Sequence, residues 1–131
     1  TFAGQSTEVE AHNIIVGTNA SNGYTMTVNG NTLTSGGNTI SAIGNTNSAS
    51  SVGTEQFGLR MSATGGVGAV VVPYAASGFA FNTGGLPDQV ATSTSASANT
   101  TYSARYLANI TSSTEAGAYT ATLTYVATAN F

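Results

Sequence analysis

The sequence contains no cysteine, no lysine and no tryptophan, and only 5% of its 131 residues are charged. Without cysteine no disulfide can crosslink the fold, so its cohesion must come from packing and backbone pairing. Arg60 and Arg105 are the only cations and the net charge is -3. A chain of this kind has no basic patch for a phosphate backbone, which argues against nucleic acid as a partner.

Long apolar runs are also missing. No stretch approaches the roughly 20 apolar residues that a membrane-spanning helix needs, so we expect no membrane insertion. The absence of lysine excludes covalent pili built through Lys–Asn isopeptide bonds or through a lysine acceptor. The chain begins with Thr1 instead of Met, which we interpret as the product of secretory-signal removal and hence as an extracellular or cell-surface location.

The dominant positive signal is a period-2 alternation of apolar and polar residues, which is typical of half-buried strands. The frequent glycines, the many β-branched residues and the scarcity of helix formers predict little or no helix. We expect residues 1–131 to form a single all-β domain, an Ig-like or jelly-roll-like β-sandwich of about eight to ten mostly antiparallel strands. The clearest alternating sets are Tyr24/Met26/Val28, Phe57/Leu59/Met61, Tyr102/Ala104/Tyr106/Ala108/Ile110 and Tyr119/Ala121/Leu123/Tyr125/Ala127.

Turn residues predict two hairpins. Asn29-Gly30 supplies the positive φ angles of a type I′ turn, with residues 32–34 returning antiparallel. The turn that contains Gly117 predicts a second hairpin, between the strand at 101–110 and the last strand. Pro73 ends the apolar run 69–72 and predicts an edge strand or a strand end, because proline cannot donate to a ladder.

The residues that carry catalytic chemistry are few. His12 is the only imidazole, so no metal shell or nucleophile triad can be completed around it. Glu8, Glu10 and His12 are predicted to share one strand face at a spacing that overlaps that of glycosidase carboxylates. We interpret them as a polar stripe facing solvent or a subunit, because such enzymes need one carboxyl desolvated in a cleft. We therefore expect no enzyme, no cofactor and no bound metal.

Three acceptor triplets for N-linked glycan begin at Asn19, Asn99 and Asn109. Such triplets also arise by chance in a chain rich in Ser, Thr and Asn. We keep all three as candidate glycosylation sites.

Two segments carry a resemblance. Asn22-Gly23-Tyr24-Thr25-Met26-Thr27-Val28 and residues 113–125, which contain Ala116-Gly117-Ala118-Tyr119-Thr120, resemble the opening and closing strands of β-sandwich modules in secreted prokaryotic surface proteins. Together they cover roughly a sixth of the chain. The resemblance implies an Ig-like cell-surface module of the kind found in self-assembling donor-strand filaments and in adhesins.

The remaining assembly route is backbone pairing, in which a terminal segment of one subunit fills a strand position in the next. We expect a homopolymer, a pilus-like extracellular filament, with residues 1–11 as a candidate extended donor strand. The alternative is an adhesin or carbohydrate-binding module, for which Tyr74, Phe79 and Phe81 are the candidate ligand platform. The candidate donor and interface residues are Phe2, Ala3, Gly4, Val9, Ala11, Ile14 and Val16.

Overall fold

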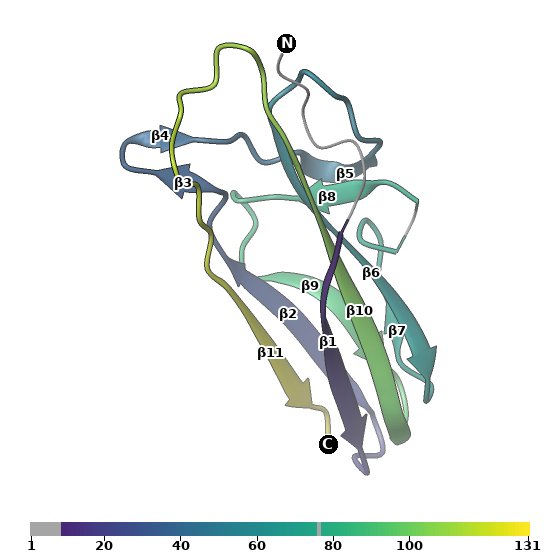
Figure 1. Ribbon diagram of the computed structural model, residues 1–131. Helices are drawn as coiled ribbons and strands as arrows, with labels where there is room; N and C mark the ends of the chain where they lie inside the picture. Colours follow the sequence, from purple (N-terminus) through teal and green to yellow (C-terminus); the bar gives the residue numbers. More distant parts are fainter. Residues whose placement is uncertain (1–8, 76) are drawn as a thin grey trace.

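The computed structural model describes residues 9–75 and 77–131 and shows two layers of antiparallel sheet (Figure 1). Sheet A has five strands in the order β1-β10-β6-β8-β5, and sheet B has four in the order β11-β2-β9-β7. A small hairpin, β3-β4, stands beside them. The strands are β1 (Val9–Thr18), β2 (Tyr24–Gly30), β3 (Thr34–Ser35), β4 (Asn38–Thr39), β5 (Gly44–Ser48), β6 (Gln56–Gly65), β7 (Ala69–Val70), β8 (Phe79–Phe81), β9 (Asp88–Ser93), β10 (Ser97–Asn109) and β11 (Leu123–Ala129).

The all-β sandwich predicted from the alternation is confirmed. The described part of the chain contains no helix, and every pairing between its named strands is antiparallel. The eleven strands slightly exceed the predicted number. Three of them, β3, β4 and β7, have only two residues each and leave almost no periodic signal in the sequence.

The core lies between the sheets and is built from the predicted alternating faces. Met26 and Val28 of β2 are fully buried, and they belong to one cluster with Leu59 and Met61 of β6. Burial of each such side chain contributes roughly 1.5–3 kcal/mol, so a few of them outweigh any surface interaction in this weakly charged chain. A smaller cluster forms around Phe57 and its neighbours Ile40 and Phe81.

A hydrogen-bonded pair of buried phenols joins the two sheets. The hydroxyl oxygens of Tyr24, on β2, and Tyr102, on β10, lie 2.6 Å apart and share a hydrogen bond. Burial raises the pKa of Tyr102 above its ordinary value, so its hydroxyl stays protonated over the physiological range. Gly68 packs directly against this pair, and a side chain there would collide with both hydroxyl groups.

Both predicted hairpins are wrong. β2 pairs with β11 and β9, not with residues 32–34, and β3 instead pairs with β4. Gly30 does have a positive φ, but it serves a close approach, because a Cβ there would collide with the carbonyl oxygen of Thr122. The strands β10 and β11 lie in different sheets, since both edges of β10 are already paired with β1 and β6.

A β-bulge at Ala11 reverses the phase of β1. Glu10 pairs with Arg105, whereas His12 pairs with Ala104, and the register shifts between Glu10 and His12. Neighbouring residues of β10 face opposite sides, so Glu10 turns outward and His12 turns toward the interior. The prediction that Glu10 and His12 share one strand face is therefore wrong, and Glu8, the third residue of the predicted stripe, lies outside the described residues.

Candidate functional site: an open groove between two sheet edges

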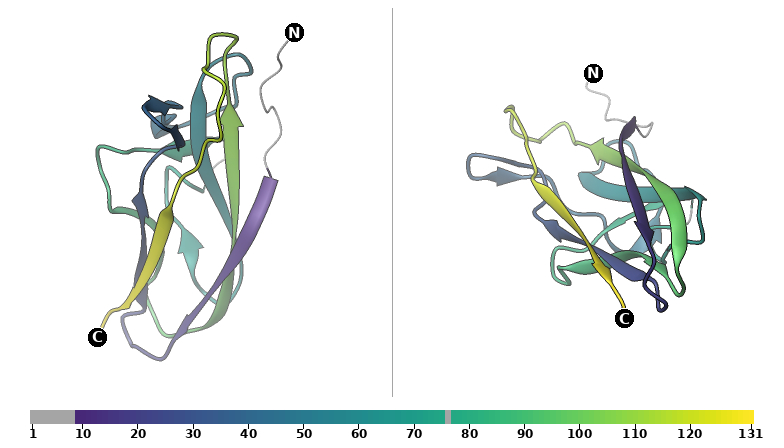
Figure 2. Two further views of the ribbon diagram at one scale, coloured as in Figure 1. Left: turned by 60° about the vertical axis from the view of Figure 1, so that its left-hand side comes forward. Right: turned by 90° about the horizontal axis from the view of Figure 1, so that it is seen from below.

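The two sheets leave a groove on the side where β1 and β11 form neighbouring edges. These strands run in the same direction along one side of the sandwich (Figure 2). The groove has a volume of about 650 Å³. Its apolar lining consists of Leu33, Phe57, Leu107, Ala108, Ala121 and Leu123.

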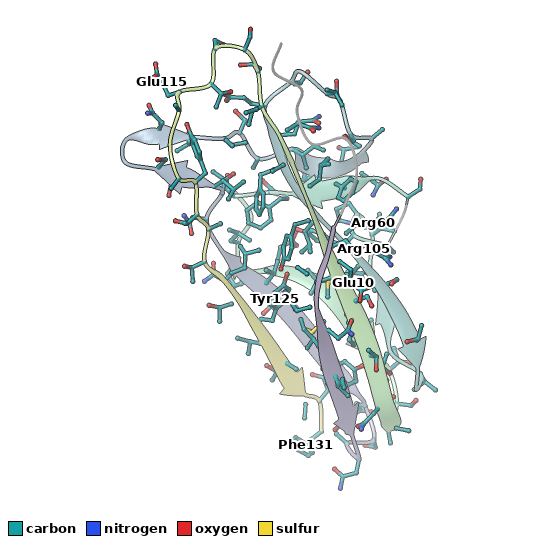
Figure 3. The ribbon with its side chains drawn as sticks, in the orientation of Figure 1. Glu10, Arg60, Arg105, Glu115, Tyr125 and Phe131 are labelled. Atoms are coloured by element: carbon teal, nitrogen blue, oxygen red, sulfur yellow. The ribbon has the colours of Figure 1, made fainter. Side chains whose placement is uncertain are left out.

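Three polar side chains, His12, Tyr106 and Tyr125, form a chain of hydrogen bonds across the groove. The bulge at Ala11 directs His12 toward Tyr106 of β10, and His12 Nε2 lies 3.0 Å from the Tyr106 hydroxyl. That hydroxyl lies 2.6 Å from the hydroxyl of Tyr125 on β11, which points from its strand into the space between the layers (Figure 3). The chain of hydrogen bonds therefore connects β1 and β10 of sheet A with β11 of sheet B.

The electrostatics of this network favour a structural role. Burial raises the pKa of Tyr106 and of Tyr125, because removing the phenolate from water disfavours its charged form. Both phenols therefore remain neutral near pH 7 and neither is prepared to act as a base. The Tyr106 ring also stacks on Phe57 with 6.1 Å between ring centroids, which fixes the floor of the groove.

The four sheet edges differ in how well they are protected against pairing. β7 has two residues, and the register of β5 with β8 is irregular between Gly44 and Ser48. β1 is interrupted by its bulge and carries Glu10 and His12. By contrast, β11 pairs with β2 in unbroken register over seven residues and contains neither charge nor proline. Short length, bulges and charges block edge pairing, so β11 is the least protected edge of the described strands.

The inner face of β11 is also incompletely covered. Tyr125, Ala127 and Ala129 pair with residues of β2 that point into the core, yet Tyr125 is only half-buried and the two alanines are exposed. Their exposure shows that the opposite layer does not cover this part of the edge strand. The sandwich is therefore open along the C-terminal part of β11, at Ala127 and Ala129.

Three charged residues, Glu10, Arg60 and Arg105, lie together on the outer face of sheet A, away from the groove. Arg60 and Arg105 are direct cross-strand partners, and Arg105 Nη2 lies 3.3 Å from Glu10 Oε2 (Figure 3). The Arg60 guanidinium lies 5.5 Å from the ring centroid of Phe79. Exposed ion pairs contribute little, about 0–1 kcal/mol, so this cluster mainly offsets repulsion between the two arginines.

The three predicted glycan acceptors fall in different environments. Asn19 and Asn99 are exposed, but Asn109 is fully buried. The Asn109 Nδ2 donates to Ser50 Oγ and Gln56 Oε1, both at 3.0 Å. A buried, hydrogen-bonded amide cannot carry a glycan in the folded chain, so Asn109 is removed from the candidates.

The predicted ligand platform is not on the surface. Tyr74 and Phe81 are fully buried and Phe79 is 5% exposed. The Tyr74 hydroxyl donates to Asp88 at 2.7 Å, and burial is the main reason that its pKa is raised. No ring face of these residues is open to a sugar, because all three belong to the packed interior.

The donor candidates divide at the start of β1. Phe2, Ala3 and Gly4 lie outside the described residues, and Val9 is placed by its backbone pairing with Tyr106. Within this chain, residues 9–18 already occupy a strand position beside β10. The remaining donor candidates are Ala11, which is the exposed residue of the bulge, and Ile14 and Val16, which are half-buried against the core.

Among residues 9–75 and 77–131, no cluster of three or more His, Asp or Glu side chains could hold a metal ion. The same part of the chain has no helix of the length and apolarity required to cross a bilayer. Comparison of the sequence with family models and with curated proteins, and of the structure with solved structures, finds no match.

Sequence reasoning did not find the groove. The alternation does place Tyr106 and Tyr125 on apolar strand faces, and both faces point inward. Nothing in the pattern indicates that these two strands lie in opposite sheets and meet through their hydroxyl groups. The bulge that turns His12 inward has no signature in the sequence either.

Proposed function

We propose that this chain is a structural subunit of a non-covalent extracellular filament that assembles by β-strand addition between subunits. The observation that carries the proposal is the β11 edge, which is seven residues long, regular in register and uncharged. A strand edge of this kind presents a row of backbone N–H and C=O groups that another chain can pair with. The apolar groove beside it would receive the inward side chains of the added strand.

Composition supports the same proposal. The absence of lysine and cysteine removes the common covalent routes of subunit linkage, and the low charge removes long-range repulsion between stacked copies. The alternative function, an adhesin or carbohydrate-binding module, loses its main support because Tyr74, Phe79 and Phe81 are buried.

The test is electron microscopy of the purified full chain at increasing concentration, with two matched edge variants. Ala127 on β11 and Ala69 on β7 are both exposed alanines on edge strands of sheet B. We expect filaments from the wild type and from Ala69→Lys, and none from Ala127→Lys, because a lysine on an edge blocks further pairing.

Circular dichroism and thermal unfolding of the unassembled variants provide the control for folding. Substitution at either exposed site should change stability by no more than about 0.5 kcal/mol. Monodisperse wild-type protein at every concentration would overturn the proposal, and so would normal filaments from Ala127→Lys.

A further inference from the structure

Two Asn-Gly pairs, Asn22-Gly23 and Asn29-Gly30, stand at the two ends of β2. In such a pair the backbone nitrogen of the glycine can attack the carboxamide carbon of the asparagine, because glycine has no Cβ to hinder the approach. Both asparagine side chains are exposed to water. The two pairs differ in what holds the attacking nitrogen.

The Gly30 nitrogen is not used in the ladder between β2 and β11 (Figure 1). The Asn130 N–H donates to the Gly23 carbonyl at 2.9 Å, in the same antiparallel register as the rest of the ladder. Hydrogen-bonded and non-hydrogen-bonded pairs alternate along such a ladder. Asn29 therefore exchanges backbone hydrogen bonds with Thr124, whereas the N–H of Gly30 points away from β11.

On its other side, β2 extends past the end of its neighbour. The last pair between β2 and β9 joins Val28 to Asp88, where β9 begins, so no strand of sheet B pairs with Gly30 there. The Gly30 N–H donates instead to Asn29 Oδ1 at 3.0 Å. The nitrogen and the carboxamide that would react with each other are therefore in direct contact.

The Gly23 nitrogen is held in a different way. Its N–H donates to the Ala20 carbonyl at 3.0 Å, which closes a tight turn. Gly23 is buried with a φ of 75°, and a Cβ there would collide with the Ser93 carbonyl. The nitrogen must give up its hydrogen bond before it can attack Asn22, and the loss of one such bond slows a reaction by roughly two- to tenfold.

We propose that Asn29 is a site of spontaneous deamidation in the folded chain, with Gly30 as the nucleophile and water as the co-reactant. The Gly30 nitrogen loses its proton and forms a bond to Asn29 Cγ, the Cγ–Nδ2 bond breaks, and the amide leaves with that proton as ammonia. Water then opens the five-membered succinimide at either carbonyl, which leaves aspartate or isoaspartate at position 29. One water molecule is consumed and one ammonia is released, with no change in oxidation state.

The product would change sheet B in two ways. Among the four strands of that sheet, Asp88 is the only charged residue, so the reaction adds a second carboxylate, opposite Thr124 of β11. The isoaspartate form also lengthens the backbone by one methylene between position 29 and Gly30. This would disturb the alignment of Gly30 with Leu123 at the end of the ladder.

The test follows the full chain in mildly alkaline water enriched in heavy oxygen, once folded and once unfolded in guanidinium chloride. Each conversion takes up one oxygen from water, so mass spectrometry detects only the residues that react during the experiment. Chymotrypsin, which cuts after Tyr24, places Asn22 and Asn29 in different peptides. The measurement does not depend on assembly, so failure of the filament proposal would leave this inference in place.

In the unfolded chain the two pairs should react at similar rates, because the reacting dipeptides are identical. In the folded chain Asn29 should react at least about fivefold faster than Asn22, since only the Gly23 nitrogen must first leave a backbone hydrogen bond. Equal rates in the folded chain, or a faster Asn22, would overturn the inference. So would a folded chain that keeps Asn29 intact while the unfolded chain is fully converted.

Two matched variants give an independent readout by anion exchange, which separates the more acidic product. Glutamine keeps the carboxamide but would have to close a larger ring, and both positions are exposed, so Asn29→Gln and Asn22→Gln should fold normally. The folded wild type and Asn22→Gln should accumulate the acidic form, and Asn29→Gln should lose at least about four-fifths of it, in line with the fivefold ratio of rates. An undiminished acidic form in folded Asn29→Gln would refute the assignment.

Discussion

Gly68 should be one of the residues least tolerant of any side chain, because it lies against the hydrogen-bonded hydroxyls of Tyr24 and Tyr102. The added Cβ of Gly68→Ala would collide with both hydroxyls and lie 2.9 Å from Thr100 Oγ1. The backbone has little freedom to retreat, since the Gly68 N–H donates to Thr100 Oγ1 at 3.1 Å. Overpacking of this kind costs about 1–3 kcal/mol.

Thermal unfolding measures the effect. A domain of this size loses about 3–5 °C in Tm per kcal/mol, so Gly68→Ala should lower Tm by roughly 3–15 °C. Gly37→Ala is the matched control, because Gly37 is exposed, has no positive φ and has no atom within 4 Å of its added Cβ. Its Tm should not fall.

A double-mutant cycle tests the cause. Tyr102→Phe removes one of the two hydroxyls that the new methyl group would meet and by itself costs about 1 kcal/mol for the lost hydrogen bond. In that background Gly68→Ala should cost less than it does in the wild type, with a coupling of about 0.5 kcal/mol or more. Equal costs in the two backgrounds would refute the argument that the phenol pair sets the constraint.

Three further outcomes follow from the buried phenols and the buried amide. The pKa values of Tyr74, Tyr102, Tyr106 and Tyr125 are raised in the folded chain. The folded chain therefore keeps phenol protons that the unfolded chain releases near pH 10. The free energy of unfolding should hold below that pH and fall above it. In an alkaline titration, the tyrosinate absorbance of these four residues should rise together with the loss of the folded circular dichroism signal. The chain has no lysine or cysteine to titrate in the same range. Ionisation of all four phenols in a chain that is still folded would contradict this prediction. Tyr125→Phe should cost about 1 kcal/mol in chemical denaturation, because Tyr106 loses a hydrogen-bond partner, and an unchanged midpoint would count against a role for that contact. When the chain is expressed in a glycosylating host, mass spectrometry should find no glycan on Asn109 of the folded protein, and occupancy there would contradict its burial.

The inward faces of the strands could be predicted from the sequence. Met26, Val28, Leu59 and Met61 are buried as their alternation indicates, because a strand with one face in a core repeats every second residue. Pro73 predicts an edge strand or a strand end, and β7, which ends three residues before it, is an edge strand of sheet B. These features depend only on local sequence.

The pairing of the strands could not be predicted in the same way. Gly30 follows Asn29 in a typical hairpin signal, but the positive φ at Gly30 serves close packing against Thr122, which is far away in the sequence. Likewise, β10 and β11 are consecutive long strands with a turn between them, yet the sandwich places them in opposite sheets. Tertiary context overrides a local turn preference in both cases.

The groove could not be predicted from the sequence for a related reason. It depends on one extra residue, Ala11, which changes the face of the residues from His12 to Val16 in β1. It also depends on where the partner layer of β11 ends, and this is a property of the packed molecule. Asn109 shows the same limit, because its triplet reads as an acceptor until its burial is known.

The inequality between the edges of sheet B has a consequence for growth. β11 offers a long regular ladder, whereas β7 at the opposite margin offers two residues. In an assembly of the proposed kind, each contact would join two dissimilar surfaces, so it could not close into a twofold dimer and would propagate from head to tail. The polymer would have polarity, with two distinguishable ends. A subunit whose donor strand was blocked could still accept a strand at its β11 edge, so it would bind at one end only and stop growth there.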